Sequence, residues 1–121
     1  HLLGFQSDIR HALEACDVLV LPSYGEGFPN VVLQAGALAK PAVVTDISGS
    51  NEIIEPGVNG WVVKPRDIET LQQAMLQSVG TSGESLRAMG LVARSRIVER
   101  FDQAAHWERM KEFYLRELNI D

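Results

Sequence analysis

The fold is decided by residues 17–46, which read Asp-Val-Leu-Val-Leu-Pro-Ser-Tyr-Gly-Glu-Gly-Phe-Pro-Asn-Val-Val-Leu-Gln-Ala-Gly-Ala-Leu-Ala-Lys-Pro-Ala-Val-Val-Thr-Asp. The stretch opens on a short apolar run, Asp17–Pro22, and closes on another, Pro41–Asp46. Such runs are typical of strands that are buried on both faces of a parallel sheet. Between them, residues 30–39 are apolar on nearly every side, which predicts a buried helix. Strand, helix and strand in this order indicate a parallel α/β fold.

The flanking segments continue the alternation. Residues 7–15 open on a Ser/Asp pair that suits a helix cap, so we expect a helix there. Residues 60–65 form a third β-branched run bounded by Gly and Pro, and Leu2-Leu3 is a candidate for a fourth strand. The sequence therefore predicts a Rossmann-like parallel sheet flanked by helices, although three or four strands make a small sheet for so many helices.

After the third run the pattern is wholly helical. Asp67 is a candidate cap for one helix, Gly80 and Gly83 interrupt the chain, and two further helices are expected over residues 84–100 and from Asp102 onward. The apolar positions expected to pack are Ile68, Leu71 and Met75 in the first helix, Leu86, Met89, Ala93 and Ile97 in the second, and Trp107, Met110, Phe113 and Tyr114 in the third.

Composition narrows the class of protein. A chain of 121 residues allows one domain, and 45% hydrophobic with 22% charged residues is ordinary for a globular protein. The net charge of −5 argues against nucleic acid as a partner, since no bulk positive charge attracts a polyanion. A single cysteine allows no internal disulfide, and no apolar run is long enough to cross a membrane. We expect a cytoplasmic protein, and His1 in place of Met suggests a piece of a longer chain.

The entry into the predicted helix is suited to bind an anion. Pro29 fits the first helical position, and Phe28, in the capping position, has no side-chain oxygen. The N–H groups of Asn30, Val31 and Val32 would then lack partners within the helix. Because this end of a helix is also the positive end of its dipole, an external anion is a natural ligand there.

Two side chains flank this helix tip. Glu26 lies in the preceding loop, and Gln34 lies one turn, about 5.4 Å, beyond Asn30. Both can bond hydroxyl groups, and we expect Gln34 to be a buried amide that needs a partner. The alternative is equally open at this point: Gln34 would bond a neighbouring carbonyl, and Glu26 would be a solvated loop carboxylate. The glycines at 25 and 27 either shape a turn or let a ligand approach the backbone.

Five segments in order carry a family resemblance. They are Asp17–Ser23, Glu26–Leu33, Lys40–Asp46, Gly49–Ile54 and Asn59-Gly60. With these segments the chain resembles the nucleotide-sugar domain of retaining glycosyltransferases of the GT-B fold, family 4, from about Leu3 to Tyr114. In that family two glutamates eight positions apart flank the donor. The first resembles Glu26 and holds hydroxyls of the transferred sugar; the second grips the ribose, and Gln34 stands in its place.

The resemblance implies a set of site residues. Glu26 would be the catalytic group, and the substrate-binding residues would be Glu26, Gly27, Phe28, Pro29, Asn30, Val31 and Gln34. A neutral amide makes weaker hydrogen bonds than a carboxylate, so the resemblance predicts altered ribose binding by Gln34. Ala39 and Ser48 also depart from the family pattern, because the family commonly has glycine at both positions.

The resemblance also implies what the parent protein does. Residues 1–121 would be a single partial domain, the C-terminal half of a GT-B fold with a helical C-terminal part, and the N-terminal acceptor domain would be absent. The parent would transfer a hexose from a nucleoside diphosphate sugar to a carbohydrate or lipid-linked acceptor, with retention, in polysaccharide biosynthesis. It would need no cofactor or metal, and any membrane association would run through the missing part. The piece alone would be inactive.

A second hypothesis comes from a different class. The chain would be a non-catalytic α/β module, either a phosphate-binding domain of receiver type or a degenerate glycosyltransferase domain kept for interaction. Gln34 and the small size motivate it. The remaining polar candidates favour structural roles: Cys16 is expected to be a small core residue, Glu52 to complement a helix dipole, and the three histidines show no ligand spacing.

Overall fold

The computed structural model describes residues 1–118. Three strands form one parallel sheet in the order β1 (Leu19–Leu21), β2 (Ala42–Thr45) and β3 (Gly60–Val63). Leu19 lies opposite Ala42, which lies opposite Gly60. The predicted α/β fold is confirmed, and each strand lies within the run that predicts it. Leu2 and Leu3 are exposed and add no fourth strand.

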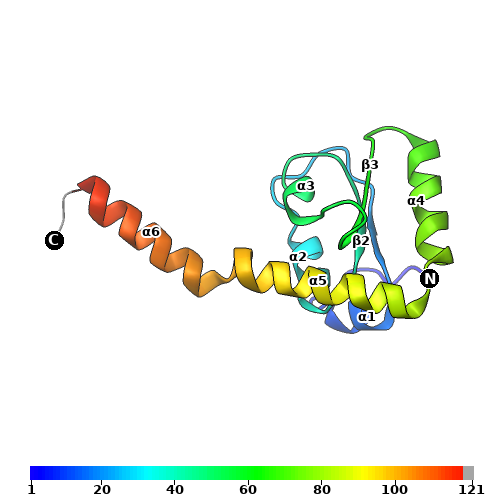
Figure 1. Cartoon of the computed structure of the whole chain (residues 1–121), viewed down its shortest axis with the longest axis horizontal. Coiled ribbons are helices and arrows are strands. Elements are labelled where there is room, and N and C mark those ends of the chain that lie inside the picture. The colour runs from blue at the N-terminus through cyan, green and yellow to red at the C-terminus, as the bar shows by residue number, and fades with distance from the viewer. Residues whose placement is uncertain (119–121) are drawn as a thin grey trace.

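Helices cover both faces of the sheet. They are α1 (Arg10–Ala15), α2 (Asn30–Ala37), α3 (Ser50–Ile53), α4 (Ile68–Gly80), α5 (Gly83–Phe101) and α6 (Gln103–Leu118). Figure 1 shows α2 and α3 on one side of the strands and α4 on the other, with α6 running away from the body. The alternation of strand and helix therefore builds three layers, as parallel connections require.

The central strand β2 is buried on both of its faces. Val44 joins the cluster with Val32 of α2 and Ile53 of α3, whereas Val43 packs with Val63 and with Ala74 of α4. All four β2 residues are buried. A continuous apolar run is the expected sequence of such a strand, since successive side chains point to opposite faces.

The first helix begins later than expected, at Arg10. A carboxylate oxygen of Asp8 accepts the Arg10 N–H at 3.0 Å and so anchors the first turn. The hydrogen bond from the Arg10 guanidinium holds the pKa of the Asp8 carboxyl at about 2, below its usual value. Cys16 follows this helix and is half-buried, with its thiol donating to the carbonyl oxygen of Leu13 at 3.2 Å.

Helix α4 packs on the sheet through a different face from the one that the apolar spacing predicted. Ile68 is 83% exposed and Met75 is 44% exposed, whereas Ala74 and Ser78 are buried against the sheet. The small side chains face inward because they let the helix lie close to the strands. The prediction of Ile68 and Met75 as core residues is therefore wrong, and only half-buried Leu71 contacts the cluster around Val43.

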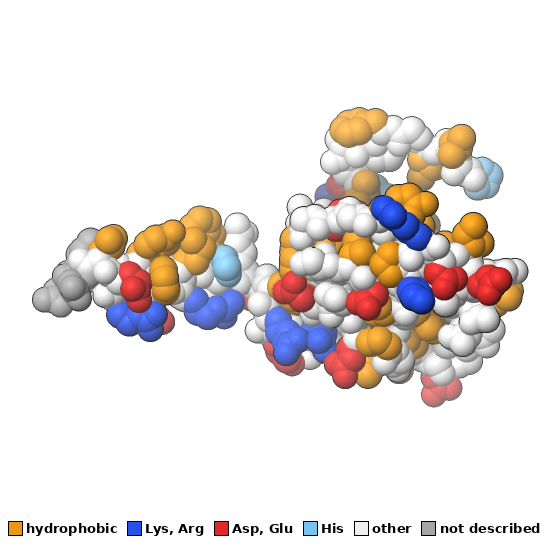
Figure 2. All heavy atoms as spheres, turned by 90° about the horizontal axis from the view of Figure 1, so that it is seen from above, with side chains coloured by type: hydrophobic (Ala, Val, Ile, Leu, Met, Phe, Trp, Pro, Cys, Tyr) orange, Lys and Arg blue, Asp and Glu red, His pale blue; other side chains and the backbone are white. Residues whose placement is uncertain are grey.

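The last two helices begin at side-chain caps, of which the sequence predicts only Asp102 as the start of a helix. Ser82 accepts the N–H of Ser85 at the start of α5, and Asp102 accepts the N–H of Ala105 at the start of α6. Ala93 of α5 is buried, and Leu86, Met89 and Ile97 are half-buried, as the spacing predicts. Helix α6, in contrast, buries none of its residues. Figure 2 shows orange side chains on this projecting helix. Trp107, Phe113 and Tyr114 are exposed, so the expected packing is not found within the described residues and this apolar face lies bare.

The turn after α2 contains a residue in a strained conformation. Ala39 has a φ of 57°, and the Lys40 N–H donates to the carbonyl oxygen of Ala35 at 2.9 Å. The left-handed conformation is costly for an L-residue with a Cβ, whereas glycine adopts it freely. Ala39 therefore adopts the left-handed conformation that a glycine, the common residue of the family at this position, would adopt without strain.

Replacing Ala39 with glycine should raise the free energy of unfolding by about 0.5–1 kcal/mol, which is the relieved strain less the greater flexibility of the unfolded chain. Urea unfolding of the two proteins measures the difference. Ala88→Gly, at an exposed position inside α5, is the matched control and should lose about 0.5–1 kcal/mol. Equal losses at the two positions would contradict the interpretation.

Candidate functional site

The candidate site lies at the carboxyl edge of the sheet. Because β1 and β2 are parallel, the loop after Leu21 and the loop after Thr45 leave the sheet at the same edge. Ligands of open α/β sheets bind at this edge, where loops rather than strands supply the contacts. The loop after β1 leads into α2, and the loop after β2 leads into α3.

The two loops touch at a glycine. Gly49 has a φ of 86°, and a Cβ at this position would lie 2.9 Å from the carbonyl oxygen of Gly27 and 3.0 Å from Pro29. Only glycine satisfies both the positive φ and the close approach. The loop between β2 and α3 therefore packs directly against residues 27–29, which lead into α2.

The start of α2 differs from the prediction by one residue. Pro29 is the cap, with φ −78° and ψ 96°, and Asn30 is the first helical residue. The Val32 N–H donates to the Pro29 carbonyl oxygen at 3.0 Å. The prediction that this N–H is free to bind a ligand is therefore wrong. Among the described residues no acceptor meets the N–H groups of Asn30 and Val31. The positive end of the helix thus offers an anion two free N–H donors, where the sequence predicted three.

Glu26 is held by a chain of side-chain contacts. The Ser23 hydroxyl donates to a carboxylate oxygen of Glu26 at 2.6 Å. The hydroxyl of Thr45, which is buried at the end of β2, donates to the Ser23 carbonyl oxygen. The half-buried carboxylate is therefore tied to the central strand through Ser23, and it is more than a freely solvated loop group.

Gln34 lies where the helix is open to solvent. It is exposed, so the expectation of a buried amide that needs a protein partner is wrong. The reason is that α2 packs on the sheet and on α5 through Val32, Ala35 and Gly36, which leaves the stripe through Asn30 and Gln34 uncovered. The amide is thereby available to a ligand that also contacts the first turn.

The structure places the other predicted site residues around the loop that enters α2. Phe28 turns its ring toward Phe101 at the end of α5, with 5.5 Å between the ring centroids. Pro29 is buried and Val31 is half-buried, whereas Gly27 is exposed. Phe28 therefore anchors the loop to α5 through its ring.

Three contacts of the site were not identified from the sequence, namely those of Ser23, Thr45 and Phe101. Ser23 lies three residues before Glu26, which is a spacing that allows a local hydrogen bond and could have indicated it. Thr45 and Phe101 are 22 and 73 positions away from their partners, so only the folded chain brings them together.

The described residues show neither a metal cluster nor a membrane helix. Within residues 1–118 no three His, Cys, Asp or Glu side chains gather closely enough to hold a metal ion. Across the same residues no helix combines the length and the apolar character that crossing a membrane demands. Glu52 is exposed in the first turn of α3, the position at which a carboxylate complements the helix dipole.

Comparisons with known proteins agree on one family. Residues 1–80 match the family model described as glycosyl transferases group 1. An Escherichia coli UDP-Gal:α-D-GlcNAc-diphosphoundecaprenol α-1,3-galactosyltransferase is 32% identical over 114 residues, covering 94% of this chain and 29% of that enzyme. A Campylobacter jejuni N,N'-diacetylbacillosaminyl-diphospho-undecaprenol α-1,3-N-acetylgalactosaminyltransferase is 44% identical over 73 residues, covering 60% of this chain and 19% of that enzyme.

Solved structures share the fold. Anabaena HepE in complex with UDP superposes with a TM-score of 0.85 at 26% identity, over 93% of this chain and 31% of that one. Sucrose-phosphate synthase from Thermosynechococcus elongatus also gives 0.85, at 25% identity, over 93% of this chain and 28% of that one. The chain thus spans less than a third of the length of these proteins. On the family match over residues 1–80, the chain belongs to the group 1 family of glycosyl transferases.

Proposed function

We propose that this chain is the donor-binding part of an enzyme that transfers a sugar from a nucleoside diphosphate sugar to an acceptor. One observation carries the proposal. Two free N–H groups at the tip of α2 lie immediately after a loop in which Ser23 holds the Glu26 carboxylate, at the carboxyl edge of a parallel sheet. The tip suits a phosphate, and a fixed carboxylate suits sugar hydroxyls.

In this proposal different residues bind the diphosphate, the sugar and the ribose. The N–H groups of Asn30 and Val31 bind the diphosphate and stabilise the negative charge that grows on it as the sugar leaves. Glu26 and the main chain of Gly27 and Phe28 orient the sugar, and Gln34 faces the ribose. No metal or other cofactor takes part, and the transfer retains the configuration at the sugar carbon, as the family resemblance implies.

The similar proteins support the choice of donor and acceptor. HepE has been solved in complex with UDP and with UDP-glucose. The names of the E. coli and C. jejuni relatives describe transfer of a galactose or an N-acetylgalactosamine to a sugar on diphosphoundecaprenol, and other relatives are named for capsular polysaccharide or amylovoran biosynthesis. We propose a hexose donor and a lipid-linked or carbohydrate acceptor for the parent, in polysaccharide biosynthesis.

We also propose that residues 1–121 form one partial domain. The rest of the parent protein would supply the acceptor domain, the second wall of the cleft and any contact with a membrane. The small sheet and the exposed residues of α6 support this division.

A degenerate domain that has lost transfer activity is the second candidate. The observation that favours it is Gln34, because the resemblance places a carboxylate at this position and an amide makes weaker bonds to hydroxyls. Both candidates keep the helix tip, so they differ in the strength of nucleotide binding and not in the fold.

Titration of the chain with UDP tests the donor site. We expect saturable binding that Gln34→Glu strengthens about fivefold, because a carboxylate accepts hydroxyl hydrogen bonds more strongly than an amide. Calorimetry measures both constants. Gln72→Glu, on an exposed position of α4, adds the same charge away from the site and should leave the constant unchanged.

Variants at the site itself make the titration decisive. Glu26→Ala with the UDP-sugar, and Gln34→Ala with UDP, should each weaken binding. Absence of any binding, or binding that neither variant alters, would count against the donor site. If Gln34→Glu leaves the binding constant unchanged, the proposed contact between Gln34 and the ribose is wrong, whereas the proposed diphosphate site at the tip of α2 is unaffected.

A further inference from the structure

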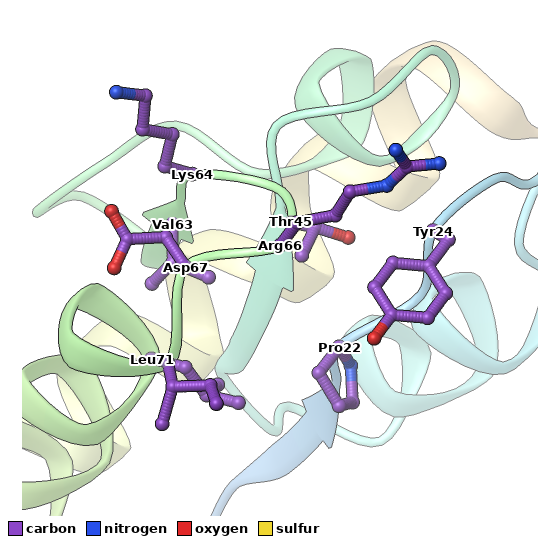
Figure 3. Close-up of a pocket in the computed structure, with 9 residues that line it drawn as sticks. Pro22, Tyr24, Thr45, Val63, Lys64, Arg66, Asp67 and Leu71 are labelled. Atoms are coloured by element: carbon purple, nitrogen blue, oxygen red, sulfur yellow. The ribbon is translucent and has the colours of Figure 1, made fainter.

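A cavity opens at the same edge of the sheet, on the side of α4. It has a volume of about 500 Å³ and lies beyond the carboxyl ends of all three strands. Pro22 and Tyr24 line it from the loop after β1, and Thr45 lines it from the end of β2. From the end of β3 and the loop after it, the lining residues are Val63, Lys64, Arg66 and Asp67. Leu71 of α4 also lines the cavity, and Figure 3 labels it beside that helix. The donor-site residues Asn30 and Gln34 do not line this cavity.

One wall of the cavity is an arginine in a strained conformation. Arg66 has a φ of 58°, a value that favours glycine, yet it carries a long charged side chain. Figure 3 shows this side chain reaching toward Tyr24, and its guanidinium carbon lies 5.7 Å from the centre of the Tyr24 ring. Strained residues concentrate at binding sites, where the surrounding structure maintains them.

Positive charge exceeds negative charge among the residues that line this cavity, which include Lys64, Arg66 and Asp67. Within residues 1–118 neither Arg66 nor Lys64 forms an ion pair with a carboxylate. The carboxylate of Asp67, which also lines the cavity, accepts the Thr70 N–H at 3.0 Å and caps α4. Lys64 and Arg66 are thus two exposed cations without a carboxylate partner, in a protein whose net charge is −5. Figure 3 shows that their side chains extend to opposite sides, so only the Arg66 guanidinium lies beside Tyr24.

We propose that this cavity binds a phosphate-bearing group, of the size and charge of a diphosphate, and that it does so apart from the tip of α2. Arg66 presents the guanidinium fork that matches phosphate oxygens, whereas Lys64, whose side chain extends to the opposite side, adds only to the positive potential of the loop. Tyr24 supports the guanidinium through its ring. The hydroxyl of Thr45 links the two sites, since it donates to the Ser23 carbonyl oxygen beside Tyr24, and Ser23 in turn holds Glu26.

The site is testable on the chain alone with inorganic pyrophosphate. Amide NMR should show saturable shifts at Tyr24, Lys64 and Arg66. Arg66→Gly should weaken this binding about fivefold and should not destabilise the fold, because glycine prefers the backbone conformation at this position. Lys64→Gln should weaken it about twofold. The control is Arg94→Gln, which removes a charge from an exposed position of α5 and should change nothing.

The outcomes separate this site from the donor site. Pyrophosphate that shifts only residues 30–34, or that binds Arg66→Gly as tightly as the unaltered chain, would overturn the proposal without touching the proposed donor site. Loss of UDP binding in the Gln34 variants has no bearing on Arg66. A phosphate on a lipid presents the same group, so phosphatidic acid vesicles are titrated in parallel. Shifts at Arg66 with either probe, lost in Arg66→Gly, support the site and identify which source it accepts.

Discussion

Gly90→Ala should destabilise the chain by about 3 kcal/mol, which is a large part of the roughly 5–15 kcal/mol that stabilises an ordinary domain. A Cβ on Gly90 would lie 1.9 Å from the carbonyl oxygen of Ala39 and 2.6 Å from its carbonyl carbon. These atoms belong to the main chain of the turn that ends α2, so no rotation of a side chain relieves the overlap. Helix α5 would have to move away from α2.

The measurement is thermal or urea unfolding, with a midpoint expected about 10 °C lower for Gly90→Ala. Two matched substitutions complete the experiment. In Gly80→Ala the added Cβ meets no atom within 4 Å, and in Gly36→Ala it meets the flexible side chain of Ile97 at 2.8 Å. Gly80→Ala should not destabilise the chain, and Gly36→Ala should cost clearly less than Gly90→Ala. Similar losses at all three positions would show that the close approach of α5 is not what matters.

The second large effect concerns transfer itself. In the full-length parent, Glu26→Gln should lower kcat/KM by about 100-fold, because a misplaced sugar loses the alignment that Glu26 and the loop provide. Gln is close to Glu in size, so the contacts with the loop are largely kept while the charge is lost. The loss should appear in kcat more than in KM for the nucleotide, since the diphosphate is bound elsewhere, at the tip of α2.

An assay of sugar transfer with a radiolabelled UDP-sugar measures this loss. Glu84→Gln, an exposed carboxylate in the first turn of α5, is the charge-matched control and should keep its activity. The 121-residue chain assayed alone should give no turnover. Full activity of Glu26→Gln would remove Glu26 from the proposed mechanism, and turnover by the chain alone would show that it needs no acceptor domain.

The local sequence pattern predicted where strands and helices lie, but it predicted less well which face of each helix is buried. The run Pro41–Asp46 predicted a strand buried on both faces, and β2 is buried at all four of its residues. For α4 the apolar spacing was equally regular, but Ala74 and Ser78 face the sheet and Ile68 is exposed. A helix with apolar residues on more than one side has several possible inner faces. The choice depends on how closely each face can approach the strands.

The same limit applies to the candidate site. The order of Glu26, Pro29 and Asn30 before an apolar helix predicted an anion site at a helix tip, because the free N–H groups follow from local geometry. The burial of Gln34 was predicted wrongly, since nothing near it in sequence tells which side of α2 the sheet and α5 cover. The contacts that hold the loop, from Thr45 and Phe101, also come from distant segments.

The sequence by itself determined the order of strands and helices, the cap at Asp67, the start of a helix at Asp102 and, to within one residue, the entry into α2, because these depend on interactions within a few residues. Tertiary structure alone decided that Glu26 is tied to β2 through Ser23 and Thr45, that Gln34 faces solvent, and that Arg66 reaches toward Tyr24 at a cavity shared by three strands. The physical reason is that exposure and contact between distant segments are set by how the layers pack, and no local pattern contains that information.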